Sequence, residues 1–394
     1  HDVGDVTNWT YGFKTLFTYL DEIVDRTEIS LDGLSIEGMP GRALMSAARG
    51  LNGTTSTNAT AVEPTATDTT ADVVALLKDE LNVIVEGVAG SGKSHLLGAL
   101  RPFYAQVEVI VFHPSTSYEE FVSGLRPTRT QGGTGFEGVA GIFVLACQRA
   151  AADPENLHLL FIDEINRANT SRVFGDLMLP IEKTKRFPAA NLSEGHALMS
   201  LAPPGATAVR LQTPVGEDLM DILVVPDNLH ILGTMNSTDR SVGTIDLALR
   251  RRFAWVEMEP LSAALLQEDP DFVAKYSLDD SLKPDWVAVA EWYGETNEVL
   301  LEAIGPDARL GHAYIFGAHS PLAAARALSS QLAEIAFTFN VDPSVLENNP
   351  PIELNGAGLS LNAAYRGTGL GRRPSVITQQ LSSSDNPPTD GTAP

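Results

Sequence analysis

The spacing of apolar residues divides the chain into regions with different predicted structure. Near the start, Phe13, Leu16, Phe17, Leu20 and Ile23 recur at intervals of three and four, which predicts the apolar face of a helix. We therefore expect residues 1–51 to form a small helical segment. Residues 52–71 are mostly Thr, Ala, Asn and Ser and offer almost nothing to bury, so they predict a flexible linker.

From residue 72 the pattern changes to short apolar runs separated by helical spacing. A helix is predicted over 73–81, and strands are predicted over 83–86, 107–112, 158–162 and 229–234. Strands that alternate with helices are typical of βαβ units, which build a parallel sheet covered on both faces. Residues 72–259 are thus predicted to form an α/β domain, with a surface hairpin insertion in the loop-rich stretch 185–226.

Beyond residue 259 the apolar spacing is helical almost throughout. The set Leu328, Leu332, Ile335, Ala336 and Phe339 is one example, and it predicts a smaller all-helical domain over 260–345. The remainder, 346–394, turns to Gly, Ser, Pro and Thr, so we expect a mostly irregular or disordered tail. Arg366, Arg372 and Arg373 in that tail could contact phosphate.

Composition and charge narrow the classes of function. The 394 residues include 27 Lys+Arg and 50 Asp+Glu, a net charge of −23, and 43% are hydrophobic. This composition excludes a wholly disordered or collagen-like protein. The acidity argues against a protein that coats nucleic acid, so any DNA contact is expected to be local or to come from another subunit.

The sequence also indicates a compartment. Cys147 is the single cysteine, and it lies in the apolar run 142–147, so it is predicted to be a small buried hydrophobe. One cysteine excludes a disulfide framework and fits a reducing cytosol. No run reaches the roughly 20 apolar residues that a membrane span needs, and no signal peptide opens the chain. We therefore expect a cytoplasmic protein with no membrane contact.

The clearest chemical motif follows the first predicted strand. Residues 87–94, GVAGSGKS, match the phosphate-binding pattern G-x-x-x-x-G-K-[ST] between a strand and a helix. Its glycines let backbone N–H groups approach phosphates, and the helix N-terminus adds positive potential. Lys93 would reach the terminal phosphates, and the Ser94 hydroxyl would ligate Mg²⁺. The predicted nucleotide contacts are Gly87, Gly90, Ser91, Gly92, Lys93, Ser94 and His95.

Two acids end the apolar run 159–162. Ligands of parallel sheets bind at the carboxyl ends of the strands, where Asp163 and Glu164 emerge. Asp163 would hold the Mg²⁺ hydration shell, and Glu164 could act as the general base that polarises the attacking water. Paired acids favour hydrolysis over binding alone. Downstream, the helical face of Val173, Phe174, Leu177, Met178 and Ile181 is predicted to be core.

Two further groups each allow two interpretations. Asn236 ends the last predicted strand and could orient water at the terminal phosphate; on spacing alone, a turn-forming asparagine is the better explanation. Arg250, Arg251 and Arg252 could simply complement a helix dipole. Alternatively, one guanidinium could enter a neighbouring subunit's site and neutralise charge on the transferred phosphoryl group. Together with the other motifs, the arginines favour the second interpretation.

These residues, from about 81 to 316, resemble the AAA+ superfamily and, within it, the McrB-like NTPase subunits of modification-dependent (type IV) restriction systems. Four stretches carry the resemblance besides the phosphate loop. They are FHPSTSYEEFVSGLRP (112–127), FIDEINRAN (161–169) with VFGDLM (173–178), MNSTDRS (235–241) and RLGHAY (309–314). The resemblance implies an α/β AAA+ P-loop NTPase with a central parallel sheet flanked by helices, followed by a helical lid.

The resemblance also implies roles and partners. Asn236 would be the sensor asparagine, with Asp239 and Arg240 in the same nucleotide-sensing loop. Arg250 or Arg251 would act in trans, and Arg309 of the lid would contact the nucleotide of its own subunit; without the family, Arg309 reads as an ordinary surface residue. The family implies a homo-oligomeric, hexameric ring that uses GTP, although ATP stays open because the phosphate loop contacts only phosphates. It also implies an McrC-like endonuclease partner and DNA translocation in antiviral defence.

Two other functions remain open from the sequence. A MoxR-like AAA+ ATPase would remodel protein partners, and its relatives share the DEINRA stretch but not the MNxxDRS stretch. A nucleotide-gated scaffold with negligible turnover is the other alternative, and the intact Glu164 argues against it.

Overall fold

The computed structural model describes residues 66–130, 133–192, 195–238, 245–277, 280–341, 350–356, 358–366 and 373–380. The expected helical segment 1–51 and residues 52–65 of the expected linker lie outside these residues. Helix α3 (Ala66–Glu80) begins inside the stretch expected to be linker. Val73, Val74 and Leu77 of α3 are buried, and a helix fixed by such packing extends at little cost into a preceding Ala/Thr stretch. Among the described residues, no helix is long and apolar enough to span a membrane.

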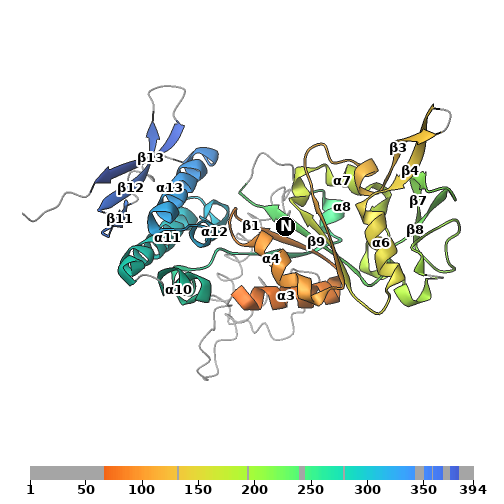
Figure 1. Cartoon of the computed structure of the whole chain (residues 1–394), viewed down its shortest axis with the longest axis horizontal. Helices are drawn as coiled ribbons and strands as arrows, with labels where there is room; N and C mark the ends of the chain where they lie inside the picture. Colours follow the sequence, from red (N-terminus) through yellow and green to blue (C-terminus); the bar gives the residue numbers. More distant parts are fainter. Residues whose placement is uncertain are drawn as a thin grey trace, which may run out of the picture. The chain divides into compact units, whose positions relative to one another are not determined.

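A five-stranded parallel sheet lies at the centre of the α/β domain (Figure 1). Its strands are β1 (Asn82–Gly87), β2 (Gln106–Val111), β5 (His158–Asp163), β9 (Leu229–Asn236) and β10 (Ala254–Glu257). They lie side by side in the order β10-β1-β9-β5-β2. Every pairing in this sheet is parallel. The four predicted strands are therefore confirmed, and β10 completes the sheet beyond β1.

Helices bury both faces of this sheet. Val83, Val85 and Phe161 pack in one cluster with residues of α3 and of α4 (Lys93–Leu100). Ile84 and Leu160, their neighbours in sequence, belong to the cluster on the opposite face. Successive side chains of a strand point to opposite faces, so a sheet covered on both sides has continuously apolar strands. This is why the central strands carry no polar alternation.

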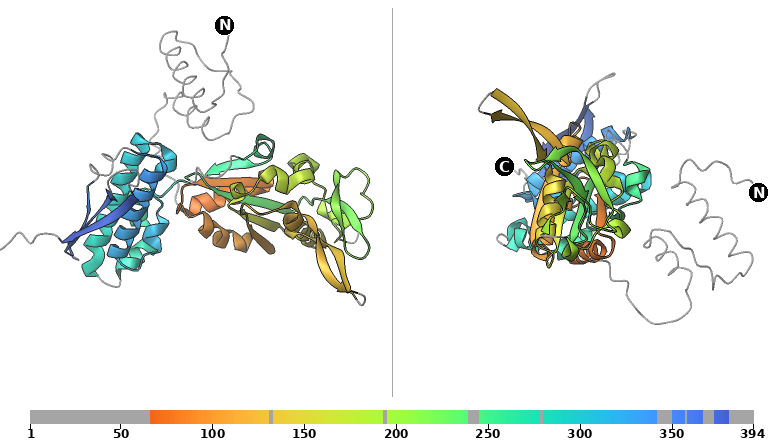
Figure 2. Two further views of the ribbon diagram at one scale, coloured as in Figure 1. Left: turned by 90° about the horizontal axis from the view of Figure 1, so that it is seen from above. Right: turned by 90° about the vertical axis from the view of Figure 1, so that its right-hand side faces the viewer.

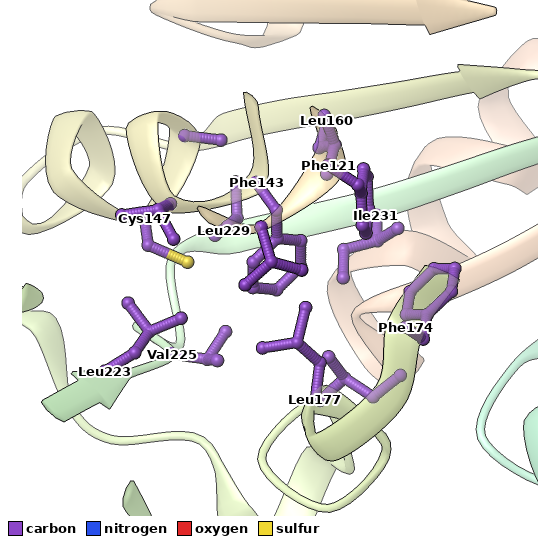
Figure 3. Packing of buried hydrophobic residues seen from close by; sticks show 14 of the residues in the cluster. Phe121, Phe143, Cys147, Leu160, Phe174, Leu177, Leu223, Val225, Leu229 and Ile231 are labelled. Carbon is purple, nitrogen blue, oxygen red and sulfur yellow. The ribbon is translucent and has the colours of Figure 1, made fainter. Parts of the chain in front are cut away.

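The larger cluster contains the predicted core helix. It includes aromatic side chains of α5 (Tyr118–Phe121), α6 (Ile142–Ala152) and α7 (Thr170–Phe174). The ring centroid of Phe121 lies 5.4 Å from that of Phe143 and 5.0 Å from that of Phe174 (Figure 3). Cys147 is fully buried in this cluster, as predicted. The five predicted core residues all belong to it, with Met178 only partly buried.

Two β insertions extend the α/β domain. Strands β3 (Ser123–Thr130) and β4 (Gly133–Ala140) form an antiparallel hairpin that projects from it (Figure 2). This hairpin was not predicted from the sequence, because β3 contains Gly, Pro and three hydroxyl residues. The hairpin predicted within 185–226 is present as β7 (Ala208–Val215) and β8 (Met220–Val224), with β6 (Leu198–Met199) paired to β8. Leu211, Leu223 and Val224 tie it to the main core.

The predicted helical domain follows the sheet. Its helices are α9 (Ala263–Glu268), α10 (Pro270–Ser277), α11 (Lys283–Ala303), α12 (Ala313–Phe316) and α13 (Pro321–Thr338). Trp286 and Tyr293 of α11 are buried in the second core cluster. The predicted apolar face of α13 is buried there too, except for Phe339, which is partly buried. We call these helices, with the connecting segment 304–312, the lid.

The C-terminal region corrects one prediction. Residues 346–394 were expected to be mostly irregular, but they contain three antiparallel strands: β11 (Ile352–Leu354), β12 (Leu359–Arg366) and β13 (Arg373–Gln380). Ile352, Leu354 and Leu361 are buried in the core of the lid. These few apolar residues fall on one face of short strands, so packing on the lid outweighs the weakly structured composition. Arg366 and Arg373 are opposite each other in register, and Arg372 lies outside the described residues.

Candidate active site

The predicted site residues meet at the carboxyl ends of three adjacent strands. Gly87 at the end of β1 is the register partner of Asn236 at the end of β9. Strand β9 also pairs with β5, which ends in Asp163. The phosphate loop, the acidic pair and the asparagine therefore share one edge of the sheet, the edge at which parallel α/β sheets bind ligands.

The phosphate loop has the backbone conformation that its glycines allow. Gly90 has a φ of 80°, and Gly92, which precedes α4, has a φ of 93°. Both values lie in the left-handed region, which only glycine adopts without strain. The first N–H groups of α4 have no partner within the helix, so the loop and helix start form a cradle suited to an anion. Ser94 and His95 are exposed at this helix start.

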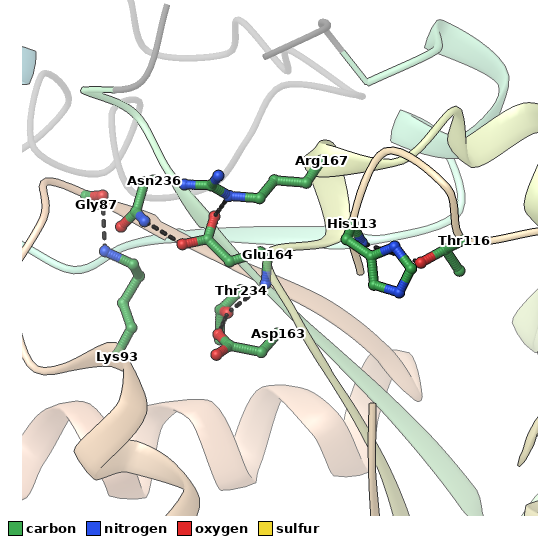
Figure 4. Close-up of polar contacts among 9 residues, drawn as sticks. All are labelled: Gly87, Lys93, His113, Thr116, Asp163, Glu164, Arg167, Thr234 and Asn236. Atoms are coloured by element: carbon green, nitrogen blue, oxygen red, sulfur yellow. Dashed lines mark hydrogen bonds and ion pairs between the residues drawn. The ribbon is translucent and has the colours of Figure 1, made fainter. Parts of the chain in front are cut away.

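Lys93 is folded back onto the phosphate loop in this structure. Its Nζ donates to the carbonyl oxygen of Gly87 at 2.8 Å (Figure 4) and to that of Val88 at 2.7 Å. Burial lowers the pKa of Lys93 to about 8, and the charges of Glu164 and Asp163 oppose that shift. A buried ammonium group held by two carbonyls can exchange them for phosphate oxygens, which carry the charge that the carbonyls lack.

A threonine positions the acidic pair. Thr234 of β9 donates its hydroxyl to Asp163 Oδ1 at 2.5 Å, and the same hydroxyl accepts from the Glu164 N–H at 3.3 Å. Thr234 is 1% exposed, so this contact is shielded from water. Glu164 has a φ of 54° and a ψ of 44°, an uncommon conformation for a non-glycine residue. Strain of this kind clusters at functional sites, where the surrounding contacts enforce it.

Both carboxylate oxygens of Glu164 are engaged. Asn236 Nδ2 donates to Oε1, and Arg167 Nε lies 3.3 Å from Oε2 (Figure 4). Asn236, for which the spacing favoured a turn, thus directly contacts the candidate base. Oε2 makes no hydrogen bond in the described structure, so it keeps lone pairs that can accept a proton from water.

The loop that follows β9 also contacts the phosphate loop. The Ser237 N–H donates to the Gly87 carbonyl at 3.1 Å, and the Ala89 N–H donates to Thr238 Oγ1 at 3.3 Å. The described part of the stretch MNSTDRS, residues 235–238, is therefore adjacent to the loop that would hold the phosphates. Asp239 and Arg240, predicted to sense the nucleotide, lie outside the described residues.

The three arginines have different surroundings. They lie at the C-terminal end of α8 (Leu247–Arg250): Arg250 is its last residue, and Arg251 and Arg252 follow it. The N-cap Asp246 of this helix accepts from the Ala248 N–H at 2.8 Å. Arg252 donates to the Met178 and Ala248 carbonyls and forms an ion pair with Glu182. The Arg250 guanidinium lies 4.5 Å from the Trp255 ring centroid, and Arg251 is exposed. In the described part of the chain, neither Arg250 nor Arg251 bonds to this subunit's phosphate loop or acidic pair.

Arg309 is held by its own surroundings. Its Nε donates to the Pro306 carbonyl at 3.1 Å, and its Nη2 lies 3.5 Å from carboxylate oxygens of Glu257 and Glu259. Burial, followed by the nearby Glu259 charge, raises the pKa of Glu257, and Arg309 opposes that shift. The Arg309 guanidinium is therefore paired with groups of its own subunit, and its predicted contact with the nucleotide stays a prediction.

The residues present fit Mg²⁺ better than a fully protein-bound metal. Within the described ranges, no cluster of three or more His, Cys, Asp or Glu could hold a metal ion. Ser94 and Asp163 provide one hydroxyl and one carboxylate, and Thr234 bonds to only one oxygen of Asp163. Mg²⁺ typically takes one or two such ligands and completes its shell with water and substrate phosphates.

Two contributors to this geometry were not predicted from the sequence. Thr234 is a polar residue two positions before the end of a mostly apolar strand, and that position is a signal in the sequence. Arg167 stands three residues after Glu164, within reach of its carboxylate. The strand order places Thr234 beside the acids, and that order was not available from the sequence.

Comparisons with known proteins find similarity over the α/β domain that carries this site. Residues 82–253 match the family described as AAA domain (dynein-related subfamily). The chain is 34% identical over 243 residues to the type IV methyl-directed restriction enzyme EcoKMcrB subunit of Escherichia coli K12, covering 59% of this chain and 47% of that protein. It is 24% identical over 213 residues to the type II restriction enzyme BsuMI component YdiS of Bacillus subtilis 168, covering 47% of this chain and 59% of that protein. The chain therefore spans about half the length of the curated relatives it matches.

Proposed function

We propose that this chain, an AAA+ P-loop protein with an McrB-like nucleotide-binding domain, is a Mg²⁺-dependent nucleoside triphosphatase that cleaves the bond between the β- and γ-phosphates. One observation carries the proposal. The phosphate loop, the Asp163/Glu164 pair and Asn236 stand at the ends of three neighbouring parallel strands, and Asn236 bonds to Glu164. A site for binding alone would need the loop but not a carboxylate held in a strained conformation beside it.

Each residue has a defined task in this proposal. The Lys93 ammonium group leaves the carbonyls of Gly87 and Val88 and donates to terminal phosphate oxygens instead. The negative charge of the phosphate compensates the buried ammonium for the water it has lost. Glu164 accepts the proton of the attacking water, and Asn236 holds the carboxylate toward the phosphate loop. Thr234 fixes the relative positions of the two acids. Arg309 exchanges Glu257 and Glu259 for the nucleotide when the lid closes.

Ser94 and Asp163 would hold Mg²⁺, which supplies positive charge that stabilises the phosphate oxygens. We propose that Arg250 and Arg251 complete the site of a neighbouring subunit. The side chains of these two arginines make no hydrogen bond or ion pair in the described structure, whereas the Arg252 side chain is bound within its own subunit. A guanidinium supplied in trans typically raises phosphoryl transfer by about 10³–10⁵-fold. The site would therefore be complete only in an oligomeric ring, which we expect to be a hexamer.

Restriction is the cellular role that the relatives favour, because both matched proteins are restriction components. We propose a ring motor that acts with an McrC-like endonuclease subunit on modified or foreign DNA. The resemblance favours GTP as its substrate, with ATP as the alternative. DNA contact is expected through a local patch or another subunit, because the net charge of −23 repels a polyanion.

Phosphate release from GTP and ATP tests the enzymatic proposal. Wild-type protein should hydrolyse one of them with Mg²⁺, and Lys93→Ala should lose nucleotide binding. Glu164→Gln should keep the binding constant while turnover falls by about 10²–10⁴-fold, as expected for loss of a general base. Native turnover in Glu164→Gln would show that another group activates the water.

Mixed oligomers test the arginines. A chain with Arg250→Ala and Arg251→Ala retains its phosphate loop, whereas a Lys93→Ala chain retains its arginines. Neither should hydrolyse nucleotide alone, and their mixture should regain activity at interfaces that combine the intact halves. Absence of recovery at every mixing ratio would contradict action in trans.

A further inference from the structure

The segment of the lid that precedes α12 lies directly on the phosphate loop. A Cβ atom on Gly311 would lie 2.2 Å from the Ala89 carbonyl oxygen, so the two backbones are in contact and only glycine fits. The Ala313 N–H donates to the Gly90 carbonyl at 2.9 Å, and Gln331 Nε2 of α13 lies 3.3 Å from the Ala89 carbonyl. The lid thus meets the phosphate loop on both sides of one residue, His312.

This segment is held firmly on its own side. Asn297 of α11 accepts from the Leu310 N–H at 2.6 Å and donates to the Leu310 carbonyl at 3.2 Å. Leu310 is fully buried in the lid core. The backbone that carries His312 therefore has little freedom, and the direction of its ring is set by the fold.

The protonation of His312 follows from its neighbour. The Leu261 N–H lies 3.1 Å from Nδ1 and can only donate, so Nδ1 accepts and carries no proton. The proton of the neutral ring then resides on Nε2. Burial lowers the pKa of His312 to about 4; the charge of Asp269 opposes this shift, and the nearby His95 and Lys93 add to it. At neutral pH the ring is an uncharged donor with a fixed tautomer.

That donor faces the phosphate cradle. A Cβ atom on Gly92 would lie 3.3 Å from His312 Nε2, so Nε2 stands over the side of Gly92 that has no side chain. Gly92 caps the N-terminus of α4, where the cradle is built. Glycine at this position lets phosphates approach the backbone closely. Among the described residues, none accepts a hydrogen bond from Nε2.

From this geometry we infer that His312 is a nucleotide-binding residue of the lid, whose Nε2–H donates to a phosphate oxygen of the nucleoside phosphate bound in the same subunit. The inference deepens the proposed function and rests on it. His312 bridges the Leu261 backbone and the phosphate chain, so the lid is attached to the bound nucleotide through an uncharged contact. The other lid contact, through Arg309, is charged and must first leave two glutamates.

Two conservative variants separate the two nitrogens. In His312→Asn, the side-chain oxygen can replace Nδ1 as the acceptor for Leu261, but nothing reaches Gly92. In His312→Gln, the amide can reach the position of Nε2 and donate there, but the Leu261 contact is lost. The probes are GDP and ADP with Mg²⁺, measured by calorimetry, because diphosphates are not consumed. Thermal unfolding of each variant reports whether the lid still packs.

We expect His312→Asn to raise the diphosphate dissociation constant about tenfold, the size of one lost hydrogen bond of about 1.4 kcal/mol. His312→Gln should stay within about threefold of wild type by the same reasoning, despite its lost Leu261 contact. In wild-type protein labelled with ¹⁵N-histidine, the Nε2 resonance should shift when the diphosphate binds, and Nδ1 should remain unprotonated. This spectrum needs no variant, so it holds even if a variant fails to fold.

Three results would overturn the inference. They are wild-type affinity in a folded His312→Asn, a loss in His312→Gln that exceeds the loss in His312→Asn, and an Nε2 resonance unchanged by the diphosphate. Failure of wild-type protein to bind either diphosphate would instead reject the proposed function and this inference with it. Wild-type binding combined with any of the three results rejects the role of His312 alone.

Discussion

Arg186 offers a sharp test of what holds the sheet in place behind the site. This buried arginine donates from Nε to the Ile181 carbonyl at 3.1 Å and from Nη1 to the carbonyls of Pro226 at 3.2 Å and Leu229 at 3.1 Å. Its Nη2 donates to Asn82 Oδ1 at 2.6 Å. Asn82 and Leu229 begin β1 and β9, the strands whose other ends carry the phosphate loop and Asn236.

The change Arg186→Met keeps a linear side chain but removes all four hydrogen bonds. Charged hydrogen bonds contribute about 1.5 kcal/mol each at the low end, so the gross loss is about 6 kcal/mol. Part of this loss is offset, because the folded protein no longer has to bury a charge. Burial lowers the pKa of Arg186 to about 10, and a shift of that size corresponds to a penalty of about 3 kcal/mol. We therefore expect a net loss of about 3 kcal/mol in the free energy of unfolding.

Equilibrium urea unfolding, followed by circular dichroism, measures this loss. Arg326→Met is the matched control, because Arg326 is exposed on α13 and its replacement should change stability by less than about 0.5 kcal/mol. A loss in Arg186→Met no larger than the control would refute the reasoning. It would mean that the cost of burying the guanidinium cancels its hydrogen bonds, as happens for some buried ion pairs.

Three further predictions follow from particular contacts. Gly311→Ala should push the lid off Ala89 and weaken nucleotide binding by at least about tenfold, the equivalent of one lost hydrogen bond. Gly98→Ala is the control, because a Cβ atom there meets nothing within 4 Å, and the affinity measured by calorimetry should not change. Burial lowers the pKa of His230 to about 4, so the unfolded chain binds the proton more tightly than the folded protein. The free energy of unfolding should therefore fall as pH drops from about 6.5 toward 4, by about 2 kcal/mol at pH 5. The difference in unfolding free energy between wild type and His230→Asn should therefore shrink between pH 7 and 5, and a constant difference would contradict a neutral buried histidine. Leu361→Ala should cost about 2–5 kcal/mol in chemical unfolding, because β12 is part of the lid core; an unchanged midpoint would show that these strands do not stabilise the lid.

Several features of this protein could be predicted from local sequence alone. The phosphate loop is a contiguous motif whose glycines and lysine are required by backbone geometry and charge. The four apolar strands and the helix α13 were predicted because hydrophobic periodicity acts over short stretches. Cys147 and the face of Val173 and Phe174 were predicted as core for the same reason.

Other features depend on residues far apart in the chain, so only the tertiary structure decided them. The order β10-β1-β9-β5-β2 places Asn236 between the phosphate loop and Glu164 and gives Thr234 its contact with Asp163. Hydrogen bonds of this kind join residues separated by about seventy positions, and no local pattern specifies such partners. The strands β11 to β13 were missed because three buried apolar side chains outweigh a composition rich in Gly and Ser. The tautomer of His312 likewise exists only because the folded lid brings the Leu261 amide to Nδ1.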